Sequence, residues 1–272
     1  MSVPAQIGDN SPLVLRQDDG AVAILTLNRP AARNSLSRAM LAALSARLEE
    51  VAAEDGIRAV VLAANGPAFS AGHDLKEITA HRSDPDGGRA FFEDCMAACS
   101  AVMQAVVGLP QPVVAAVQGV ATAAGCQLAA SCDLVVASSA AKFCTPGVDI
   151  GLFCSTPAVA LSRAVPRKAA MEMLLLGEMI PAEEAHRIGL VNRVVPPEAV
   201  LDTALDLARR IAARSAVAVR MGKRGFNRQI GLDLPQAYAE AGAVMVENLL
   251  AEDAAEGIGA FLGKRQPSWR HR

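Results

Sequence analysis

The chain has few aromatic residues and almost no net charge. Aromatic residues make up 3% of its 272 residues, with one Trp and one Tyr, while 52% of the residues are hydrophobic. The core is therefore predicted to consist mainly of Ala, Val, Leu and Ile. The formal net charge of −2 gives no electrostatic attraction toward nucleic acid or an anionic membrane. A chain of this length can bury a substantial core as one domain with an appendage.

Long apolar runs and paired cysteines are also missing. Gln118, Gln127 and Asp133 interrupt the longest apolar segment before it reaches the roughly eighteen residues of a membrane span. The first ten residues carry neither a charged signal region nor an Arg-rich transit helix. No Cys-x-x-Cys pair is present, which argues against a zinc or iron–sulfur site and favours a reducing compartment. We therefore predict no metal, no membrane insertion and a cytoplasmic location. The six cysteines are Cys95, Cys99, Cys126, Cys132, Cys144 and Cys154.

Strand-like and helix-like segments alternate before residue 195. Such alternation favours βαβ units with parallel strands. From there on the pattern predicts helices alone, whose Met, Leu and Val at helical spacing indicate an apolar packing face. We therefore divide the chain into a core of residues 1–197 and a helical region of residues 198–272. The predicted strands cover residues 21–27 and 58–63, and the predicted helices cover 38–51, 89–107, 198–213, 216–229, 235–250 and 253–264.

The segment from Ala115 to Val135 passes from a strand through a turn of small residues into a helix. Pro112–Val117 is typical of a buried strand, Gln118-Gly119 breaks it, and helix-compatible residues resume at Ala123. The first N–H groups of a helix lack intrahelical partners and lie at its positive end, so they can stabilise an oxygen that gathers negative charge. The turn can thus be half of an oxyanion hole, or its small residues can simply permit close packing.

A second strand, residues 58–63, leads into another glycine-containing turn, and here the sequence resembles the enoyl-CoA hydratase/isomerase (crotonase) family. Phe69-Ser-Ala-Gly-His-Asp-Leu75 is similar to the family motif Phe-Ser-Ala-Gly-x-Asp-Leu. The resemblance implies that the backbone N–H groups of His73 and Ala124 form an oxyanion hole. Ala124 stands where a glycine is usual, which keeps the donor but reduces backbone freedom. The similarity extends from about residue 13 to Trp269.

The resemblance also implies a fold and an assembly. The implied fold is α/β, with a crotonase (ClpP-like) ββα spiral core and a C-terminal α-helical trimerisation region. The implied assembly is a homotrimer, often paired into a hexamer. Within the family, residues 145–157 and 163–168 are most similar to one subgroup, for which no settled chemistry can be carried over.

Two glutamates that hydratases of this family use are replaced in this chain. In the family they hold and activate a water and deliver a proton, and the corresponding positions are Gln127 and Gly147. A glutamine orients a water but cannot take its proton, and glycine has no side chain. Losing a positioned acid or base costs about 10²–10⁴-fold each. Ordinary hydration is therefore not expected, whereas an oxyanion hole made of backbone is expected to persist.

Other residues are candidates for the missing proton chemistry. Asp149 is one candidate, because it would face the same side as Gly147 if that segment were extended. The alternative is that Asp149 caps a turn or a helix. The imidazole of His73 is a natural base near neutral pH, although in the family this side chain usually points away from the reacting carbon.

Two more pairs of residues lie near the implied site. Glu93 and Asp94 are best explained as charges on a solvated helix face. Cys144 and Cys154 are candidate nucleophiles because of their position alone. The alternative is that both are inert buried thiols.

The resemblance implies a coenzyme A site as well, and no cofactor apart from a coenzyme A thioester as substrate. Backbone around residues 71–73 would hold the adenine, while basic side chains would meet the phosphates or simply be solvated. Two of the candidates, Phe261 and Lys264, would reach across from a neighbouring subunit. The candidate binding residues are Arg33, Ala71, His73, Asp74, Leu75, Lys76, Phe261 and Lys264.

Two classes of function remain open at this point. One is an enzyme of fatty acid metabolism that acts on acyl-CoA thioesters through oxyanion stabilisation, as a lyase or isomerase like the enoyl-CoA hydratases and isomerases. The other is a non-catalytic acyl-CoA binding or assembly protein. A weaker third alternative is a hydrolase or decarboxylase of thioesters on the same fold.

Overall fold

The computed structural model describes residues 11–272, so the predictions about the first ten residues lie outside the described part. Two sheets form the centre of the molecule, a six-stranded one in the order β1-β2-β3-β5-β7-β10 and a four-stranded one in the order β4-β6-β8-β9. The pairs β1–β2 and β8–β9 are antiparallel, and the other pairs are parallel. The strands are β1 (Val14–Asp19), β2 (Val22–Leu27), β3 (Ala59–Ala64), β4 (Ala68–Ser70), β5 (Val113–Val117), β6 (Val120–Thr122), β7 (Leu134–Ser138), β8 (Lys142–Cys144), β9 (Ile180–Pro181) and β10 (Arg193–Val195).

The chain repeats one step three times as it winds through these sheets. Each step places a strand in the larger sheet, then a strand in the smaller sheet, then a helix: β3-β4-α3, in which the short α2 precedes α3, β5-β6-α4 and β7-β8-α5. The helices are α1 (Arg38–Ala52), α2 (Leu75–Ala80), α3 (Arg89–Gly108), α4 (Ala124–Ser131), α5 (Ser155–Ala164), α6 (Arg167–Leu176), α7 (Ala182–Arg187), α8 (Val200–Ala212), α9 (Ala216–Gln229), α10 (Leu234–Leu250) and α11 (Glu252–Leu262). Short 3₁₀ helices cover Pro30–Ala32, His81–Ser83, Pro146–Ile150 and Pro197–Ala199.

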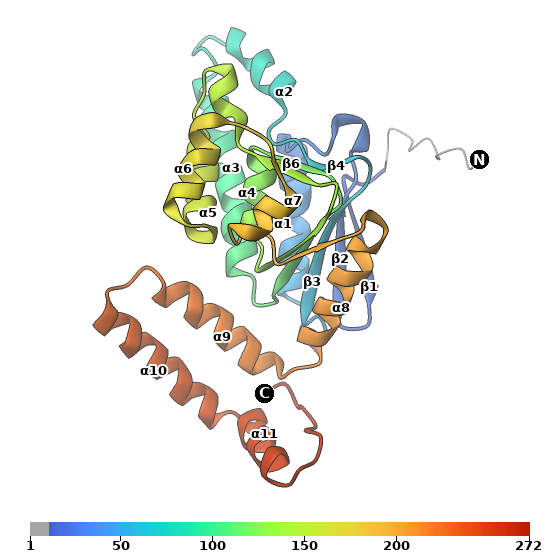
Figure 1. The fold of residues 1–272 in the computed structure, drawn as a ribbon, viewed down its shortest axis with the longest axis vertical. Helices are drawn as coiled ribbons and strands as arrows, with labels where there is room; N and C mark the ends of the chain where they lie inside the picture. Colours follow the sequence, from blue (N-terminus) through green and yellow to red (C-terminus); the bar gives the residue numbers. More distant parts are fainter. Residues whose placement is uncertain (1–10) are drawn as a thin grey trace, which may run out of the picture.

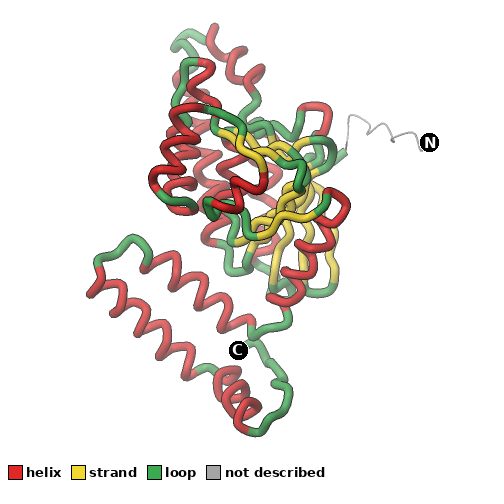
Figure 2. The backbone as a smooth tube through the Cα atoms, viewed as in Figure 1, coloured by secondary structure: helices red, strands yellow, loops and turns green. Residues whose placement is uncertain are grey.

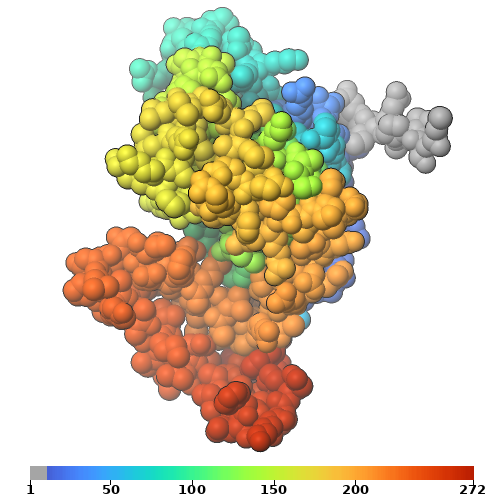
Figure 3. All heavy atoms as spheres, viewed as in Figure 1, coloured from blue at the N-terminus to red at the C-terminus, as the bar shows by residue number. Residues whose placement is uncertain are grey.

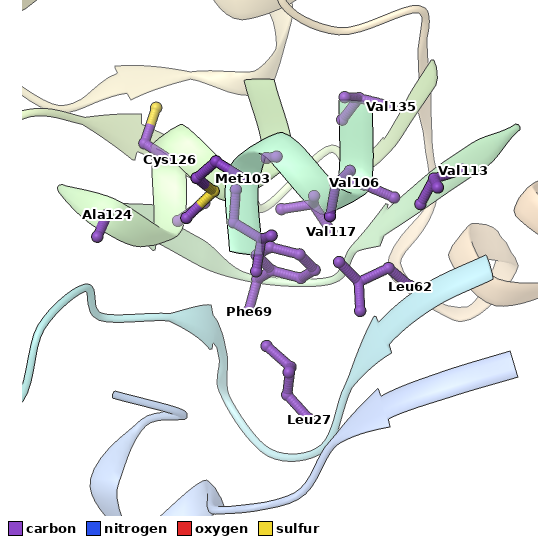
Figure 4. Packing of buried hydrophobic residues seen from close by; sticks show 14 of the residues in the cluster. Leu27, Leu62, Phe69, Met103, Val106, Val113, Val117, Ala124, Cys126 and Val135 are labelled. Carbon is purple, nitrogen blue, oxygen red and sulfur yellow. The ribbon is translucent and has the colours of Figure 1, made fainter. Parts of the chain in front are cut away.

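The central strands of the larger sheet, β3, β5 and β7, are buried on both faces, which explains why they are rich in Val and Ala. All five residues of β5 are buried, as expected for a central parallel strand covered on both sides. One face packs against α1 and α3 in the main apolar cluster, and the other packs against α8. In Figure 4 the ring of Phe69 lies among Leu27, Leu62 and Val117, so residues of four strands, β2, β3, β4 and β5, share one core.

One helix in the described part of the chain, α3, is long and apolar enough to cross a membrane by length and composition alone. Its buried residues include Cys99, Val102 and Val106, which belong to the main apolar cluster. Because the core helix of a globular protein meets the same criteria, α3 gives no argument for insertion. The absence of membrane insertion stays a prediction.

The last three helices stand apart from the rest of the molecule (Figures 1 and 2). We refer to α9–α11 as the arm and to the preceding elements as the body. The boundary predicted at residue 198 remains a prediction, and α8, beyond that boundary, packs against β3, β5 and β7 of the body. Large apolar side chains are exposed along the arm, among them Tyr238 at 74%, Leu250 at 82% and Phe261 at 82%. The surface is hollowed between the arm and the body (Figure 3).

Candidate active site

The turns that follow β4 and β6 lie directly against each other. The two strands pair in parallel, so their carboxyl ends meet at one edge of the smaller sheet. A Cβ atom built on Gly72 would lie 2.9 Å from the Cβ of Ala123 and 3.1 Å from the nitrogen of Ala124. A Cβ on Gly125 would overlap the carbonyl oxygen of Ser70. Glycine is therefore required at both places, and the structure brings together the two turns in which the sequence predicts the oxyanion donors.

The second predicted donor lies at the amino end of α4. Ala124 is the first residue of this helix, where N–H groups have no intrahelical acceptor. The residue before it, Ala123, has φ 51° and ψ −120°, a conformation that favours glycine and costs a residue with a side chain about 1–3 kcal/mol. Its N–H donates to the carbonyl of Cys144 at 3.0 Å and its carbonyl accepts from the N–H of Gln127 at 3.0 Å. The sequence predicted reduced backbone freedom at Ala124, whereas in the structure the conformation that favours glycine is at Ala123.

The first predicted donor, His73, is fixed through its backbone. It forms an isolated parallel bridge with Leu36, whose N–H donates to the carbonyl of Gly72 at 2.7 Å. The His73 ring faces α3, where Nδ1 lies 3.8 Å from Sγ of Cys95. Burial lowers the pKa of His73, against smaller opposing effects of the Leu36 backbone and the charge of Glu77. The imidazole is therefore neutral at pH 7, and its role as a base stays a prediction.

The positions of the two absent glutamates differ in what surrounds them. Gln127 lies on α4 three residues after Ala124, on the same side of the helix, and is only 4% exposed. Its Oε1 accepts no hydrogen bond from any residue between 11 and 272. Gly147 is buried in a 3₁₀ helix, and a Cβ atom there would lie 2.9 Å from Sγ of Cys154 and 3.0 Å from the carbonyl oxygen of Leu152. The thiol of Cys154 therefore fills the space beside Gly147.

The structure does not place Asp149 as the sequence argument supposed. Its segment, Pro146–Ile150, is a 3₁₀ helix rather than an extended strand, so residues two apart do not face the same side. Asp149 is exposed, and its Oδ1 lies 3.4 Å from where a Cβ on Gly177 would stand, at the end of α6. The geometric reason for placing its carboxylate beside Gly147 is therefore removed.

The remaining acid and thiol candidates take no visible part in the site. Glu93 and Asp94 lie on the exposed side of α3, where they pair with Arg89 at 3.4 Å and with Arg38 at 2.7 Å. Burial raises the pKa of both Cys144 and Cys154, so each remains a protonated thiol at neutral pH. A protonated thiol is a poor nucleophile, which favours the alternative that these cysteines are packing residues.

The predicted coenzyme A residues fall into two groups. The N–H of Ala71 donates to the carbonyl of Arg33 at 2.9 Å, which places the exposed Arg33 beside the first turn. Leu75 and Lys76 are exposed at the start of α2. By contrast, Phe261 and Lys264 lie at the end of the arm, far from α2 within one chain (Figure 1). A contribution from these two residues therefore requires a second copy of the chain.

Asp74 has a structural role that the motif alone did not reveal. Its Oδ1 caps α2 by accepting from the N–H of Lys76 at 3.1 Å, while Oδ2 pairs with Arg29 at 2.8 Å. Asn34 completes the support, because its buried side chain donates to the carbonyls of Asn65 and Ala68. Sequence reasoning did not assign a role to Arg29 or Asn34. The signal that could have identified them is that the segments in which they lie, Leu27-Asn-Arg-Pro30 and Asn34-Ser-Leu36, also resemble the family.

A groove of about 940 Å³ lies between the body and the arm, and Gln127 is the one residue of the site that lines it. Residues of α3, α4 and α5 form one wall, and residues of α9 form the other. Its lining is mainly apolar and includes Met103, Gln127, Val159, Phe226 and Ile230. Gln127 is thus on the helix that begins at the oxyanion turn and also borders this groove.

Comparison with known proteins supports the resemblance seen in the sequence. A family model described as enoyl-CoA hydratase/isomerase matches residues 17–272. The mitochondrial enoyl-CoA hydratase domain-containing protein 3 of Rattus norvegicus is 48% identical over 94% of this chain and 83% of that protein. This is the subgroup that residues 145–157 and 163–168 resemble, so that prediction is confirmed. A probable enoyl-CoA hydratase of Rhizobium meliloti is 36% identical over 95% of this chain and 98% of that protein.

Solved structures agree with the fold. An enoyl-CoA hydratase of Mycobacterium smegmatis superposes with a TM-score of 0.91 at 52% identity, covering 95% of this chain and 99% of the other. Human enoyl-CoA hydratase domain-containing protein 3 superposes with a TM-score of 0.89 at 44% identity, covering 94% and 100%. The predicted crotonase spiral with a helical C-terminal region is confirmed.

The same comparison contradicts the predicted cytoplasmic location. The similar proteins of Rattus norvegicus, Mus musculus, Homo sapiens and Danio rerio are all named mitochondrial. The prediction was wrong because unpaired cysteines indicate reducing conditions without distinguishing one reducing compartment from another.

Proposed function

Because the chain belongs to the enoyl-CoA hydratase/isomerase family, we propose that it binds an acyl-CoA thioester and polarises the thioester carbonyl between the backbone N–H groups of His73 and Ala124. The observation that carries this proposal is the close approach of Gly72 to Ala123 and Ala124, which unites the two turns. Paired backbone donors aimed at a developing oxyanion are a large contribution to acyl-transfer and enolate chemistry.

The side chains around these donors support binding and polarisation better than hydration. Gln127 cannot take a proton from water, and beside Gly147 stands the protonated thiol of Cys154. Neither position offers the ionised carboxylate that general base catalysis needs at neutral pH. We therefore propose that hydration of a trans-2-enoyl thioester is slow, and that any reaction catalysed here depends mainly on stabilising the enolate.

A pair of glycine variants tests the oxyanion turns. In Gly72→Ala the new methyl group meets Ala123 and Ala124, so the turns must separate and binding of butyryl-CoA should weaken at least about tenfold. Gly20→Ala is the matched control, because Gly20 also has a positive φ of 59° but has no atom within 4 Å of its added Cβ. Isothermal titration gives the dissociation constants, and circular dichroism checks the fold. Equal binding by wild type and Gly72→Ala would contradict the proposed site.

A carboxylate-restoring variant tests the cause of slow hydration. Gln127→Glu together with Gly147→Glu restores both acids, but Cys154 must also become smaller because its sulfur obstructs the new side chain. We expect Gln127→Glu/Gly147→Glu/Cys154→Ala to hydrate crotonyl-CoA about 10²-fold faster than wild type. The control is the double variant Gly147→Glu/Cys154→Ala, which keeps Gln127. Rapid hydration by the wild type would refute the argument from missing carboxylates.

A second candidate function is that of a non-catalytic acyl-CoA binder. The replacement of both carboxylate positions favours it, since an oxyanion hole alone can retain a thioester. Binding of butyryl-CoA without conversion of enoyl, hydroxyacyl or saturated thioesters would support the binder over the enzyme.

We also propose that the arm joins copies of this chain into a homotrimer or a pair of trimers. The supporting observation is the row of large apolar side chains that the arm exposes, including Tyr238 and Leu250. In such an assembly Phe261 and Lys264 would approach a neighbouring subunit. Light scattering coupled to gel filtration gives the number of subunits, and a monomer at micromolar concentration would contradict the proposal.

A further inference from the structure

The imidazole ring of His73 is held by a thiol on α3. Its Nδ1 lies 3.8 Å from Sγ of Cys95, which is a hydrogen-bonding distance for sulfur. Its Nε2 is buried and has no hydrogen-bond partner within residues 11–272. Cys95 is 1% exposed, so the contact is shielded from water. In the described part of the chain, Cys95 is therefore the side chain to which this ring is hydrogen-bonded.

Both partners of this contact are neutral at pH 7, which sets its direction. Burial lowers the pKa of His73 and raises the pKa of the Cys95 thiol. The charges of Glu77 and Asp94 raise the pKa of the thiol further, while Arg38 opposes them. An imidazole nitrogen is a good acceptor and sulfur a weak one, so the S–H group of Cys95 donates to Nδ1. The ring proton of His73 is then on Nε2.

The N–H of His73 lies in the same peptide plane as the carbonyl of Gly72. That carbonyl accepts from the N–H of Leu36 at 2.7 Å, which holds one side of the plane. In a planar trans peptide the carbonyl and the N–H point in opposite directions, so the N–H of His73 points away from Leu36. One hydrogen bond still lets the plane turn about the line between its two Cα atoms. Gly72, with a φ of 79°, has no side chain to resist that turn.

The contact with Cys95 gives this peptide a second point of attachment, through the ring of His73. We propose that Cys95 is a positioning residue, which holds the ring and so keeps the N–H of His73 directed at the thioester carbonyl. This inference rests on the proposed function, because it requires that carbonyl to bind between the oxyanion turns. A donor that points away from its acceptor loses much of its effect, because hydrogen bonds weaken steeply as they bend.

The first experiment determines which nitrogen of His73 carries the proton. The chain has four histidines, and NMR of the protein labelled with ¹⁵N in its histidines distinguishes the two neutral tautomers. His73→Gln identifies the signals of His73. We expect the proton on Nε2 in the wild type at neutral pH. A proton on Nδ1 would show that the thiol is not the donor and would overturn the inference.

The second experiment measures polarisation of the carbonyl in butyryl-CoA labelled with ¹³C at that carbon. Drawing electrons toward the carbonyl oxygen moves its resonance downfield. In Cys95→Ala we expect about half of the downfield shift produced by the wild type, because one of the two donors is misdirected. Butyryl-CoA should bind about threefold to tenfold more weakly, while coenzyme A should bind as it does to the wild type. Cys95→Ser keeps a donor and should lie between Cys95→Ala and the wild type.

Cys99→Ala is the matched control for the loss of a buried thiol. Cys99 lies about one turn further along α3 and is 0% exposed, but it belongs to the main apolar cluster. Its variant should show the same carbonyl shift and the same affinities as the wild type. An equal loss in Cys99→Ala would show that any cavity in α3 disturbs the turn, and would overturn the role of Cys95.

The remaining outcomes separate this inference from the proposed function. An unchanged carbonyl shift in Cys95→Ala overturns the role of Cys95 while the thioester site stands. If butyryl-CoA binds the wild type no more tightly than coenzyme A, or its carbonyl resonance does not move, the proposed function fails and the inference fails with it. If Cys95→Ala does not fold, Cys95→Ser and the tautomer of His73 in the wild type decide the question.

Discussion

The body buries a large apolar core, whereas the arm exposes many of its large apolar side chains. Phe69 and Leu128 of the body are 0% exposed, while Leu250 and Phe261 of the arm are each 82% exposed. None of the 17 residues of α10 is buried. The body therefore has a core of its own, and the arm depends on contacts that one chain does not supply.

The attachment of the arm to the body differs from the packing within the body. One buried lysine on α9, Lys223, donates to Asp133 at 2.7 Å and to the carbonyls of Val106 and Gln111 at 3.2 Å each. Asp133 in turn accepts from the N–H of Val113, the first residue of β5. We call these contacts of Lys223 the anchor. Because hydrogen bonds are directional, the anchor fixes the orientation of α9 relative to the body, while it adds little apolar contact.

The largest expected effect comes from making the same substitution in both regions. Phe69→Ala removes a fully buried ring and should lower the free energy of unfolding by about 3–5 kcal/mol. Phe261→Ala should change the stability of the dilute single chain by less than about 0.5 kcal/mol, because the ring is exposed. Urea denaturation at low protein concentration measures both. Similar losses in the two variants would break the distinction between body and arm.

A smaller effect is expected at the anchor. Lys223→Met removes the side-chain donor to the carbonyls of Val106 and Gln111 and leaves Asp133 with the N–H of Val113 alone, which should cost about 1–3 kcal/mol. Arg224→Met is the matched control, since Arg224 is half exposed and pairs within the arm with Glu247 at 3.3 Å. Its cost should be at most about 1 kcal/mol.

Hydrogen exchange adds a local measurement of the anchor. In Lys223→Met the amides of α9 should exchange faster while those of β5 remain protected. Unchanged protection of α9 would show that other contacts, such as those of Asn227 with the carbonyl of Val107 and of Arg220 with Asp55, hold the arm to the body without Lys223.

The sequence predicted the regular elements of the body closely, because buried strands and amphipathic helices leave periodic patterns. The helix predicted over residues 38–51 is α1, Arg38–Ala52, and the strand predicted over residues 58–63 is β3, Ala59–Ala64. The three-residue strands of the smaller sheet, such as β4 and β6, are too short to produce a recognisable period.

The candidate site could be predicted only in part. The two turns followed from their motifs, and the structure brings them together. The filling of the space beside Gly147 by Cys154 is a contact through space between residues seven positions apart, which no local pattern records. The prediction for Asp149 assumed an extended segment, yet Pro146 begins a 3₁₀ helix that ends at Gly151 with a φ of 76°. Local backbone conformation, rather than residue type, decided that case.

The smallest expected effect concerns pH and again separates the two regions. Burial in the body lowers the pKa of His73, so the unfolded chain takes up a proton at a higher pH than the folded chain does. Stability should therefore fall as the pH drops below the unfolded value of about 6.5, by up to about 1.4 kcal/mol for each unit by which folding lowers the pKa. His73→Gln should remove this loss between pH 7 and pH 5.

The arm supplies the comparison for the pH measurement. There an exposed ion pair with Arg265 lowers the pKa of Glu256 to about 2, so any stability it contributes is present above about pH 4.5 and disappears only as the pH falls toward 2. Glu256→Gln should therefore leave the change between pH 7 and pH 5 unaltered. Urea midpoints at these two pH values decide the matter. If His73→Gln loses as much stability as the wild type over this interval, the acid sensitivity of the body has another source.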